Sequence, residues 1–133
     1  MTMLTIGAVA AQTGLTEHTL RYYEKIGLLD PVPRGPGGQR RYREQDLRWL
    51  EFLLRLRATG MPLRDMLAYA EQRRVGNTAE SLALRRKLLA AHADKVAEEI
   101  AVLQSTLQLL QGKIDIYRGW EASLPLSYQL DKE

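Results

Sequence analysis

The chain has 133 residues, enough for one ordinary domain or for a small domain with an extension. Its composition is that of a globular protein, with 45% hydrophobic and 26% charged residues and a mean hydropathy of −0.30. The lack of cysteine excludes disulfides, thiolate metal sites, iron–sulfur clusters and cysteine nucleophiles. Because the two histidines, His18 and His92, cannot form a metal site by themselves, we expect neither a metal nor a cofactor.

Positive charge is concentrated in the first part of the chain. Positions 1–76 hold 12 basic and 8 acidic residues, whereas positions 77–133 hold 7 basic and 8 acidic residues, for a formal net charge of +3. Four arginines lie between positions 34 and 43 without an acidic residue among them. This uneven distribution indicates two different tasks, and the basic balance leaves room for an anionic partner without requiring one.

The sequence gives no sign of export. Residues 1–16 carry no charge, but no basic residue precedes them and polar residues interrupt them, unlike a signal peptide. No run of eighteen apolar residues is present, so we predict no membrane span and a cytoplasmic protein.

The first 27 residues predict two short helices joined by a tight turn. Apolar residues recur at i, i+3 and i+4 from Ile6, which predicts a helix of about two turns. Gly14 allows the turn, and Thr16 is a suitable N-cap for the second helix. Gly27 would end that helix. Two short helices joined in this way are typical of a helix-turn-helix.

A proline- and glycine-rich segment follows at positions 30–42. Its three prolines and three glycines are incompatible with a helix. Val32 on one side and Arg40–Tyr42 on the other can pair as a small hairpin, with Gly35–Gly38 at its tip. A helix-turn-helix followed by a basic hairpin is the pattern of a winged helix-turn-helix.

Two more helices complete the first predicted domain, which we place at residues 1–76. Leucines at positions 47, 50 and 54 predict a central helix from about Arg43 or Glu44 to Thr59. Pro62 is tolerated at a first helical position and starts a short fourth helix. Residues 73–77 are predicted to form a polar loop.

A long helix is predicted from Ala79 to Arg118, preceded by a capping-box-like pattern of Asn77 and Glu80. It would be about 60 Å long at the standard rise per residue. Its apolar residues alternate in steps of four and three, as in the a and d positions of a coiled coil. These seam residues are Leu89, Ala93, Val96, Ile100, Leu103, Leu107, Leu110 and Ile114.

The seam needs a second helix, and the sequence predicts no other long helix. We therefore predict a homodimer, in which residues 77–118 form the dimerisation helix and residues 119–133 a short tail. Eight seam side chains contribute on the order of 10 kcal/mol per chain before ordering costs. The heptad pattern alone does not decide between parallel and antiparallel pairing.

Known catalytic motifs are missing from the sequence. It has no glycine-rich phosphate loop ahead of a helix, no H-E-x-x-H and no serine in a nucleophile elbow. The glycines of Gly35–Gly38 precede a basic strand rather than a helix. We therefore do not predict an enzyme.

Binding to DNA accounts better for the basic first domain. On the second helix His18 and Arg21 are predicted to lie on the exposed face, where an arginine can bind guanine through two hydrogen bonds. The arginines of the wing suit the sugar–phosphate backbone. Each feature has an ordinary alternative, since Arg21 can pair with Glu17, Tyr23 fits a core better than a contact, and the wing can be a charged edge strand. Their combination favours DNA binding.

Five segments of the chain carry a more specific pattern, namely Leu4–Ala10, Thr16–Glu24, Gly27–Leu29, Gln39–Tyr42 and Thr59–Leu63. The run L-R-Y-Y-E followed by the basic R-R-Y is the most specific part. In these segments the sequence resembles MerR-type transcriptional regulators over about residues 4–72. The predicted long helix fits the same family in length and position.

The resemblance implies a mainly helical fold, with a winged helix-turn-helix head, a small β-hairpin wing and a long coiled-coil dimerisation helix. It also implies a symmetric dimer with an antiparallel coiled coil, in which the second helix enters the major groove and the wings hold the backbone. The implied DNA contacts are Thr16, His18, Arg21, Tyr22, Tyr23, Arg40, Arg41, Tyr42, Met61 and Arg64.

The family mechanism implied by the resemblance is promoter distortion. Such a dimer bends and untwists DNA between −35 and −10 elements that are spaced too far apart for RNA polymerase, at an elastic cost of about 1–6 kcal/mol. Cysteine-based metal or thiol sensing is excluded here. An organic effector near Tyr117, Trp120 and Tyr128 is the predicted input. A ligand-independent repressor or architectural DNA binder, and a coiled-coil interaction module that binds protein, stay open as alternatives.

Overall fold

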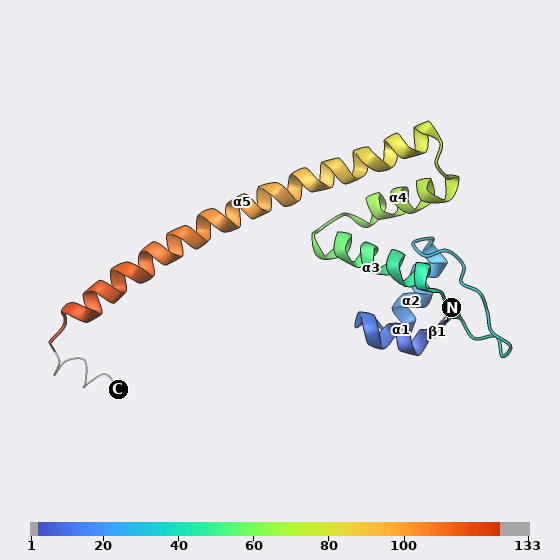
Figure 1. The fold of residues 1–133 in the computed structure, drawn as a ribbon, viewed down its shortest axis with the longest axis horizontal. Coiled ribbons are helices and arrows are strands. Elements are labelled where there is room, and N and C mark those ends of the chain that lie inside the picture. Colours follow the sequence, from blue (N-terminus) through green and yellow to red (C-terminus); the bar gives the residue numbers. More distant parts are fainter. Residues whose placement is uncertain (1–2, 126–133) are drawn as a thin grey trace. The chain divides into compact units, whose positions relative to one another are not determined.

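The computed structural model describes residues 3–125 and is mainly helical, as predicted (Figure 1). In chain order its elements are β1 (Leu4–Thr5), α1 (Ile6–Thr13), α2 (Glu17–Ile26), β2 (Arg41–Tyr42), α3 (Glu44–Ala58), α4 (Leu63–Val75) and α5 (Ala79–Ser123). The chain divides into two compact units, residues 1–92 and residues 93–133. We call the first unit the head.

The predicted helix-turn-helix is confirmed in α1 and α2. The Thr5 hydroxyl accepts a hydrogen bond from the backbone N–H of Ala8 at 3.1 Å and caps α1. Gly14 ends α1 in the left-handed region, at φ 75°, which a side chain would disfavour. The sharp turn that follows lets α2 begin three residues later, so the two helices pack at a corner.

The wing region differs in part from the prediction. A hairpin does form, because Arg34 and Arg40 make an antiparallel bridge and the Gly35 N–H donates to the Gln39 carbonyl at 2.7 Å. However, β2 pairs with the N-terminal strand β1, with Leu4 opposite Tyr42. Sequence patterning could not reveal β1, since a two-residue strand has too few positions to alternate.

α3 and α4 close the head, and α4 is longer than expected. Residues 73–77 were predicted as a polar loop, but the helix continues to Val75 and the loop is confined to residues 76–78. Polar arginines at positions 73 and 74 suggest a loop locally. In the fold both bind Asp30, which stabilises the last turn of α4.

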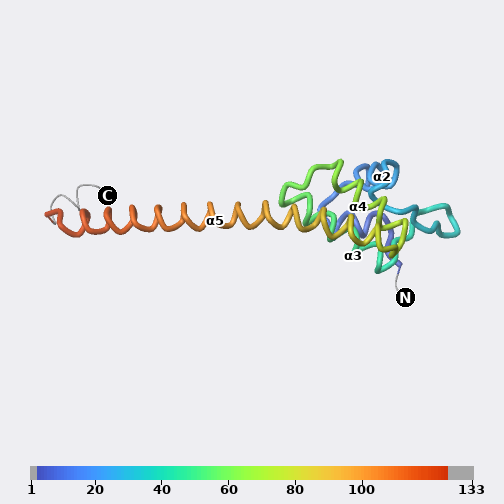
Figure 2. Tube along the Cα trace, turned by 90° about the horizontal axis from the view of Figure 1, so that it is seen from above, coloured from blue at the N-terminus to red at the C-terminus, as the bar shows by residue number. Residues whose placement is uncertain are grey.

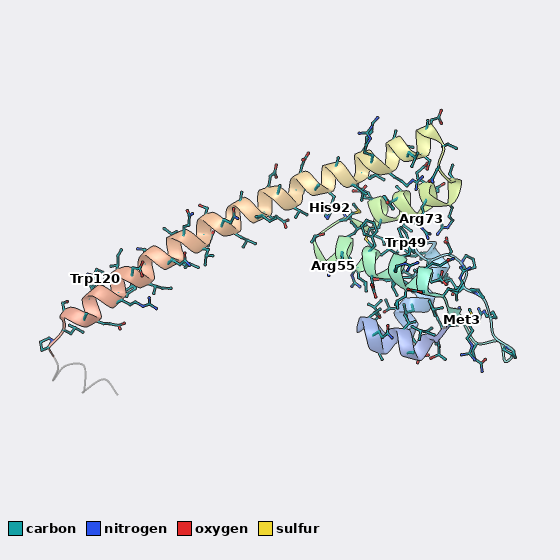
Figure 3. The ribbon with its side chains drawn as sticks, in the orientation of Figure 1. Met3, Trp49, Arg55, Arg73, His92 and Trp120 are labelled. Carbon is teal, nitrogen blue, oxygen red and sulfur yellow. The ribbon has the colours of Figure 1, made fainter. Side chains whose placement is uncertain are left out.

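The core of the head is built from the four helices α1–α4, from β2 and from the segments that follow α2 and α3. Its buried apolar residues are Val9, Leu20, Tyr23, Leu28, Leu29, Val32, Tyr42, Trp49, Leu50, Leu53, Leu56, Met61, Met66 and Ala70. The Trp49 indole N–H donates to the Leu28 carbonyl at 2.9 Å, and its ring stacks on Tyr69 at a centroid distance of 5.7 Å. Trp49 therefore anchors α3 to both the α2 exit and α4 (Figure 3).

The predicted long helix is confirmed and extends beyond its expected end at Arg118. α5 runs without interruption from Ala79 to Ser123, about 67 Å at the standard rise (Figure 2). Its cap is Thr78 rather than Asn77, since the Thr78 hydroxyl accepts from the Ser81 N–H at 3.1 Å. No helix among residues 3–125 is long and apolar enough to cross a membrane.

Candidate nucleic-acid interface

α2 has one buried apolar face and one exposed polar face. The Thr16 hydroxyl accepts from the Thr19 N–H at 3.0 Å, which fixes the start of the helix, and Gly27 ends it at φ 93°. Leu20 is fully buried. The opposite face presents side chains that can reach acceptors and phosphates on a nucleic acid, namely His18, Arg21, Tyr22 and Lys25, all of them exposed.

Arg21 is available to a ligand in spite of its ion pair. Its guanidinium lies 3.2 Å from the carboxylate of Glu17, one helical turn earlier, and both side chains are about half exposed. An exposed pair of this kind contributes only about 0.3–0.5 kcal/mol. Exchange of Glu17 for an acceptor on DNA therefore costs little.

Tyr23 lies in the core rather than on the exposed face. Its side chain is 7% exposed, and its hydroxyl accepts a hydrogen bond from Arg57 at 2.7 Å. The core interpretation drawn from the sequence agrees with this position. The alternative, in which the Tyr23 hydroxyl reaches a nucleic acid, would require the bond to Arg57 to break.

The wing is a tight basic loop whose shape depends on its glycines. Gly38 adopts a positive φ of 79°, and the carbonyl of Gly38 accepts from the Arg34 guanidinium at 3.0 Å. A Cβ atom at Gly35 would lie 2.7 Å from the Nε atom of Arg41. Since Arg41 passes this close to the backbone, any larger residue at position 35 would displace that arginine.

Arg40, one of the predicted DNA contacts, forms an ion pair within the head. Its Nε donates to the carboxylate of Glu24, and the two side chains are only 19% and 14% exposed. This largely buried pair ties the base of the wing to α2. Breaking such a pair is costly because it leaves a buried charge without a partner. Arg40 therefore positions the wing against the helix.

Tyr42, another of the predicted DNA contacts, lies in the core of the head. It is 1% exposed, and its enclosed hydroxyl has no hydrogen-bond partner among the described residues. Burial raises the pKa of this phenol, and the nearby Glu24 carboxylate raises it further. Tyr42 is therefore a neutral core residue that holds β2 on the head. Arg41, its neighbour, makes no side-chain hydrogen bond or ion pair with the described residues, which leaves its charge available.

The last two predicted contacts, Met61 and Arg64, lie at the turn between α3 and α4 and differ in exposure. Met61 is 6% exposed and packs in the core. The Arg64 side chain is 87% exposed, and its nearest carboxylate, that of Asp65, is 4.0 Å away. Only Arg64 of this pair is placed to meet a ligand.

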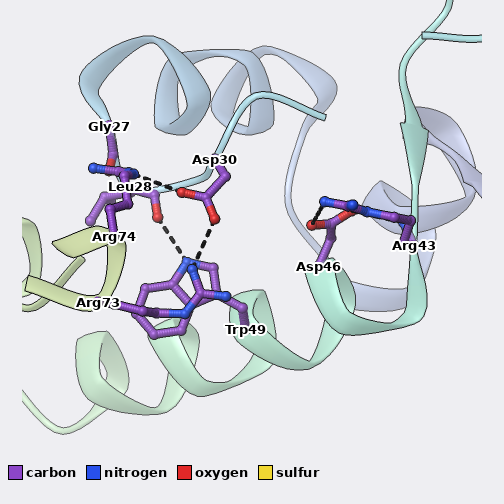
Figure 4. Close-up of polar contacts among 8 residues, drawn as sticks. All are labelled: Gly27, Leu28, Asp30, Arg43, Asp46, Trp49, Arg73 and Arg74. Atoms are coloured by element: carbon purple, nitrogen blue, oxygen red, sulfur yellow. Dashed lines mark hydrogen bonds and ion pairs between the residues drawn. The ribbon is translucent and has the colours of Figure 1, made fainter. Parts of the chain in front are cut away.

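Asp30, which the sequence did not single out, connects the α2 exit to α4 (Figure 4). Its carboxylate accepts from Arg73 at 2.9 Å and from Arg74 at 2.7 Å. Burial opposes the ionisation of Asp30, but hydrogen bonds and positive charge from the two arginines outweigh it and lower the pKa of the carboxyl. Arg73 also lies 4.2 Å above the Trp49 ring, and Arg74 donates to the Gly27 carbonyl. The end of α2 is thereby fixed to the helix that precedes α5.

A second polar contact in Figure 4 fixes the start of α3 beside the wing. The carboxylate of Asp46 accepts from the backbone N–H of Arg43 at 2.9 Å and from its guanidinium at 3.0 Å. Hydrogen bonding by Asp46 raises the pKa of Arg43. The Arg43–Asp46 contacts are local and have the three-residue spacing of a capping box, whereas the Asp30 contacts join residues 43 and 44 positions apart, which no local pattern indicates.

Most of the predicted seam of α5 is exposed in the single chain. Leu89 packs partly against the head core. The others that are large and exposed are Ile100 (50%), Leu103 (67%), Leu107 (54%), Leu110 (53%) and Ile114 (47%). His92, in the same helix, lies 2.7 Å from the Thr59 hydroxyl, which already donates to the Arg55 carbonyl. This contact between His92 and Thr59 joins α5 to the end of α3.

The predicted effector residues are described in part. Tyr117 and Trp120 form an edge-to-face ring pair, with centroids 5.2 Å apart and an interplanar angle of 89°. Both are more than half exposed. Tyr128 lies outside the described residues.

Comparison with known proteins connects this geometry to a family. Residues 4–72 match the model for the MerR HTH family regulatory protein, and residues 47–113 match the model for MerR, DNA binding. The chain is 32% identical to the uncharacterized HTH-type transcriptional regulator YyaN of Bacillus subtilis, over 88% of this chain and 92% of that protein. It is 36% identical to the HTH-type transcriptional regulator AdhR of the same organism, over 71% and 66% of the two chains.

Solved structures give the same result. HiNmlR, described as a MerR family regulator lacking the sensor domain and bound to promoter DNA, superposes with a TM-score of 0.78 at 34% identity, covering 92% of this chain and 95% of that one. A putative MerR family regulator from Listeria monocytogenes superposes with a TM-score of 0.77 at 33% identity, covering 86% of each chain. The chain therefore belongs to the MerR family of transcriptional regulators and carries its DNA-binding domain.

Proposed function

We propose that the protein acts as a homodimer that binds promoter DNA through α2 and the wing, and that it bends and untwists the duplex so that RNA polymerase can use it. The observation that carries the proposal is that the basic wing is tied to α2, beside the exposed face of that helix, by the ion pair of Arg40 with Glu24. The relative HiNmlR supports it, since that protein is described as bound to promoter DNA.

The DNA contacts that we propose divide into two groups. On α2, His18, Arg21 and Tyr22 face outward from a helix fixed at both ends, so they suit the base edges of a major groove. In the wing and at the start of α4, Arg41 and Arg64 suit phosphates, because neither is held by a close ion pair. Thr16 lies at the α2 N-terminus, where backbone N–H groups favour a phosphate.

An antiparallel homodimer is supported by the order of residue sizes along the seam. If Ile100 of one copy faces Leu103 of the other, the remaining layers follow in both directions as Val96 with Leu107, Ala93 with Leu110, and Leu89 with Ile114. Every layer then contains at least one large side chain. A parallel pairing would place Ala93 against Ala93 and leave a void, and it would bring Lys113 next to Arg118 of the partner.

The dimer gives a physical route to promoter distortion. Two equivalent heads on one coiled coil can contact two segments of the same duplex, and the contacts of both offset the elastic cost, about 1–6 kcal/mol. An effector acts on such a system by favouring one dimer geometry over another by a few kcal/mol. We retain an organic effector near Tyr117 and Trp120 as the input predicted from the sequence.

Substitutions in the two contact groups test DNA binding. Arg21→Ala should cost about 1–3 kcal/mol on the specific site and relax sequence preference, whereas Arg41→Ala should weaken binding to all sequences and lower the salt slope by about one. Arg48→Ala is the matched control, since Arg48 also has an exposed ion pair one turn away, with Glu44 at 3.2 Å, but lies on α3. Binding is measured by fluorescence anisotropy at several salt concentrations. Equal behaviour of all three variants would contradict the proposal.

Distortion is tested on the promoter itself. We expect permanganate reactivity between the −35 and −10 elements when the protein binds, and activation of a long-spacer promoter that disappears when the spacer is shortened. A protein that represses both promoters equally, without permanganate reactivity, is a ligand-independent repressor instead. A protein that ignores duplex DNA at low salt is the interaction module.

A further inference from the structure

The end of α5 carries an aromatic surface that the described part of the chain does not cover. Tyr117 is 56% exposed and Trp120 is 61% exposed, although their rings contact each other edge to face. Such a pair is already arranged without a partner, so a group that docks on it does not have to order the rings.

The register of the coiled coil determines what the rings would meet. In the antiparallel dimer Ile114 pairs with Leu89 of the second copy, and the next seam position outward is Tyr117. On the partner the corresponding position, three residues before Leu89, is Arg86. One more step along the partner leads to Leu82, which is 48% exposed.

The chemistry of these residues is complementary. Arg86 is exposed and makes no hydrogen bond or ion pair with the described residues, so its guanidinium is free to stack. The faces of tyrosine and tryptophan rings attract cations, and arginine most often fills this role. Leu82 adds an apolar surface beside the charge. Both belong to α5, whose continuous helical geometry sets their spacing.

We propose that the Tyr117–Trp120 ring pair of each chain docks on Arg86 and Leu82 of the second copy. This aromatic clamp rests on the proposed homodimer and is incomplete without the partner. An organic effector that binds the same rings would have to displace it. It occurs twice in a symmetric dimer, once at each end of the seam.

The clamp also joins each chain to the partner's α4–α5 connection. That connection is held firmly, since the buried Ser81 hydroxyl donates to the Gln72 carbonyl at 2.6 Å. Arg85, next to Arg86, donates to the Gly76 carbonyl at 3.0 Å and to the Asn77 side chain at 2.8 Å. Docking there therefore fixes both the register of the coiled coil and the place where the partner's α5 joins α4.

Cysteine cross-linking first tests the dimer on which the clamp depends. The chain has no cysteine, so any disulfide that forms must involve the thiol that was introduced. In an antiparallel dimer a mixture of Ile100→Cys and Leu103→Cys chains forms mixed disulfides, and neither variant cross-links efficiently with itself. Self-linked chains from each variant alone would show a parallel dimer, which overturns the clamp and the antiparallel proposal together. Absence of any dimer would overturn the proposed function as well.

A double-mutant cycle then tests the clamp itself. Trp120→Ala and Arg86→Ala should each weaken dimerisation about tenfold, because two contacts are lost per dimer, and the double variant should be little weaker than either. Trp120→Phe should retain most of the affinity. Arg118→Ala is the control, since Arg118 is exposed on the same helix. Dissociation constants come from sedimentation equilibrium of the full chain.

Two results would overturn the clamp while leaving the dimer intact. One is a cross-linked antiparallel dimer whose affinity changes less than twofold in Trp120→Ala. The other is a double variant whose loss equals the product of the two single losses, which shows that the residues act independently.

Discussion

The head and the second half of α5 use the same apolar residue types in opposite ways. In the head, Val9, Leu20 and Leu50 are completely buried. Between residues 93 and 123, Leu103 is 67% exposed and Leu109 is 66% exposed. The sequence of the head therefore encodes its own core, whereas the long helix leaves apolar side chains exposed in the single chain, which agrees with the homodimer that we propose.

The polar contacts of the two regions differ in the same sense. In the head, Glu24 binds Arg40 and Asp30 binds Arg73, pairs that join separate elements. In α5 the pair of Arg118 with Asp115 is local, at 3.9 Å and only three residues apart. Long-range polar contacts fix one tertiary arrangement, while local pairs support a helix whatever lies beside it.

The largest expected effect is loss of the dimer in Leu103→Glu. A carboxylate at the centre of the seam would be buried without a partner twice per dimer, at a cost of several kcal/mol. We expect association to weaken by more than about 100-fold. Sedimentation equilibrium should show a monomer, with the near-UV circular dichroism of the head unchanged.

Val102→Glu is the matched control for that variant. Val102 is 64% exposed and adjacent in sequence, but it lies outside the a and d positions. The Val102→Glu variant should remain a dimer. If both variants keep the mass of the native protein, the seam is wrongly assigned.

The next largest effect is expected in the core of the head. Leu50 is fully buried on the central helix α3, and Leu50→Ala should cost about 2–5 kcal/mol through lost contacts and a cavity. Urea unfolding, followed by tryptophan fluorescence in the Leu103→Glu background, separates this loss from dimerisation. Leu63→Ala, at a position that is 45% exposed, should cost less than about 1 kcal/mol. Similar losses for both would contradict the assigned core.

Periodicity and turn chemistry were sufficient to predict most elements of the fold. Apolar residues at helical spacing, together with Gly14 and Gly27, predicted α1, α2 and the turn between them. The alternation of three and four residues predicted α5, but not its continuation past Gly119, because a glycine within a helix resembles a stop signal locally. The β1–β2 pair depends on a contact between residues 38 positions apart, Leu4 and Tyr42, and no local signal encodes it.

The sequence was sufficient to predict which residue types form the candidate site, but not which way each side chain points. The exposed face of α2 follows from helical spacing, so His18 and Arg21 lie where expected. The wing residues do not follow such a rule. Whether Arg40 or Arg41 points outward is decided by Glu24, a partner 16 residues before Arg40. Tertiary contacts of this kind select among identical side chains, which a single sequence does not reveal.

A smaller effect should follow from loss of the Asp30 contacts. Asp30→Asn removes the charge that Arg73 and Arg74 bind, and we expect a cost of about 1 kcal/mol, since the pairs are about one third exposed. Glu44→Gln, which alters a far more exposed pair on α3, should change the free energy of unfolding by less than a few tenths of a kcal/mol. Chemical denaturation at pH 7 measures both.

The lowered pKa of Asp30 predicts how the difference in the free energy of unfolding between the native protein and Asp30→Asn changes with pH. Because the folded protein lowers the pKa of Asp30, the contribution to stability is present above the unfolded pKa, about 3.9, and is lost as the pH falls through the folded value. The gap between the native protein and Asp30→Asn should therefore narrow below about pH 4. A gap that stays constant in acid would show that the carboxylate charge does not contribute.

The smallest effects are expected from replacing a glycine by alanine, once in α5 and once in the head. At Gly112, within α5, a new Cβ meets no atom within 4 Å, so Gly112→Ala should stabilise the helix by up to about 1 kcal/mol. At Gly14 the space is equally open, but the backbone lies at φ 75°, so Gly14→Ala should destabilise the head by about 1 kcal/mol. Thermal unfolding of the two variants should therefore shift in opposite directions. If both midpoints shifted in the same direction, the space around the glycine, rather than its backbone conformation, would determine the effect of the new methyl group. The head and α5 would then not differ in how they tolerate the same substitution.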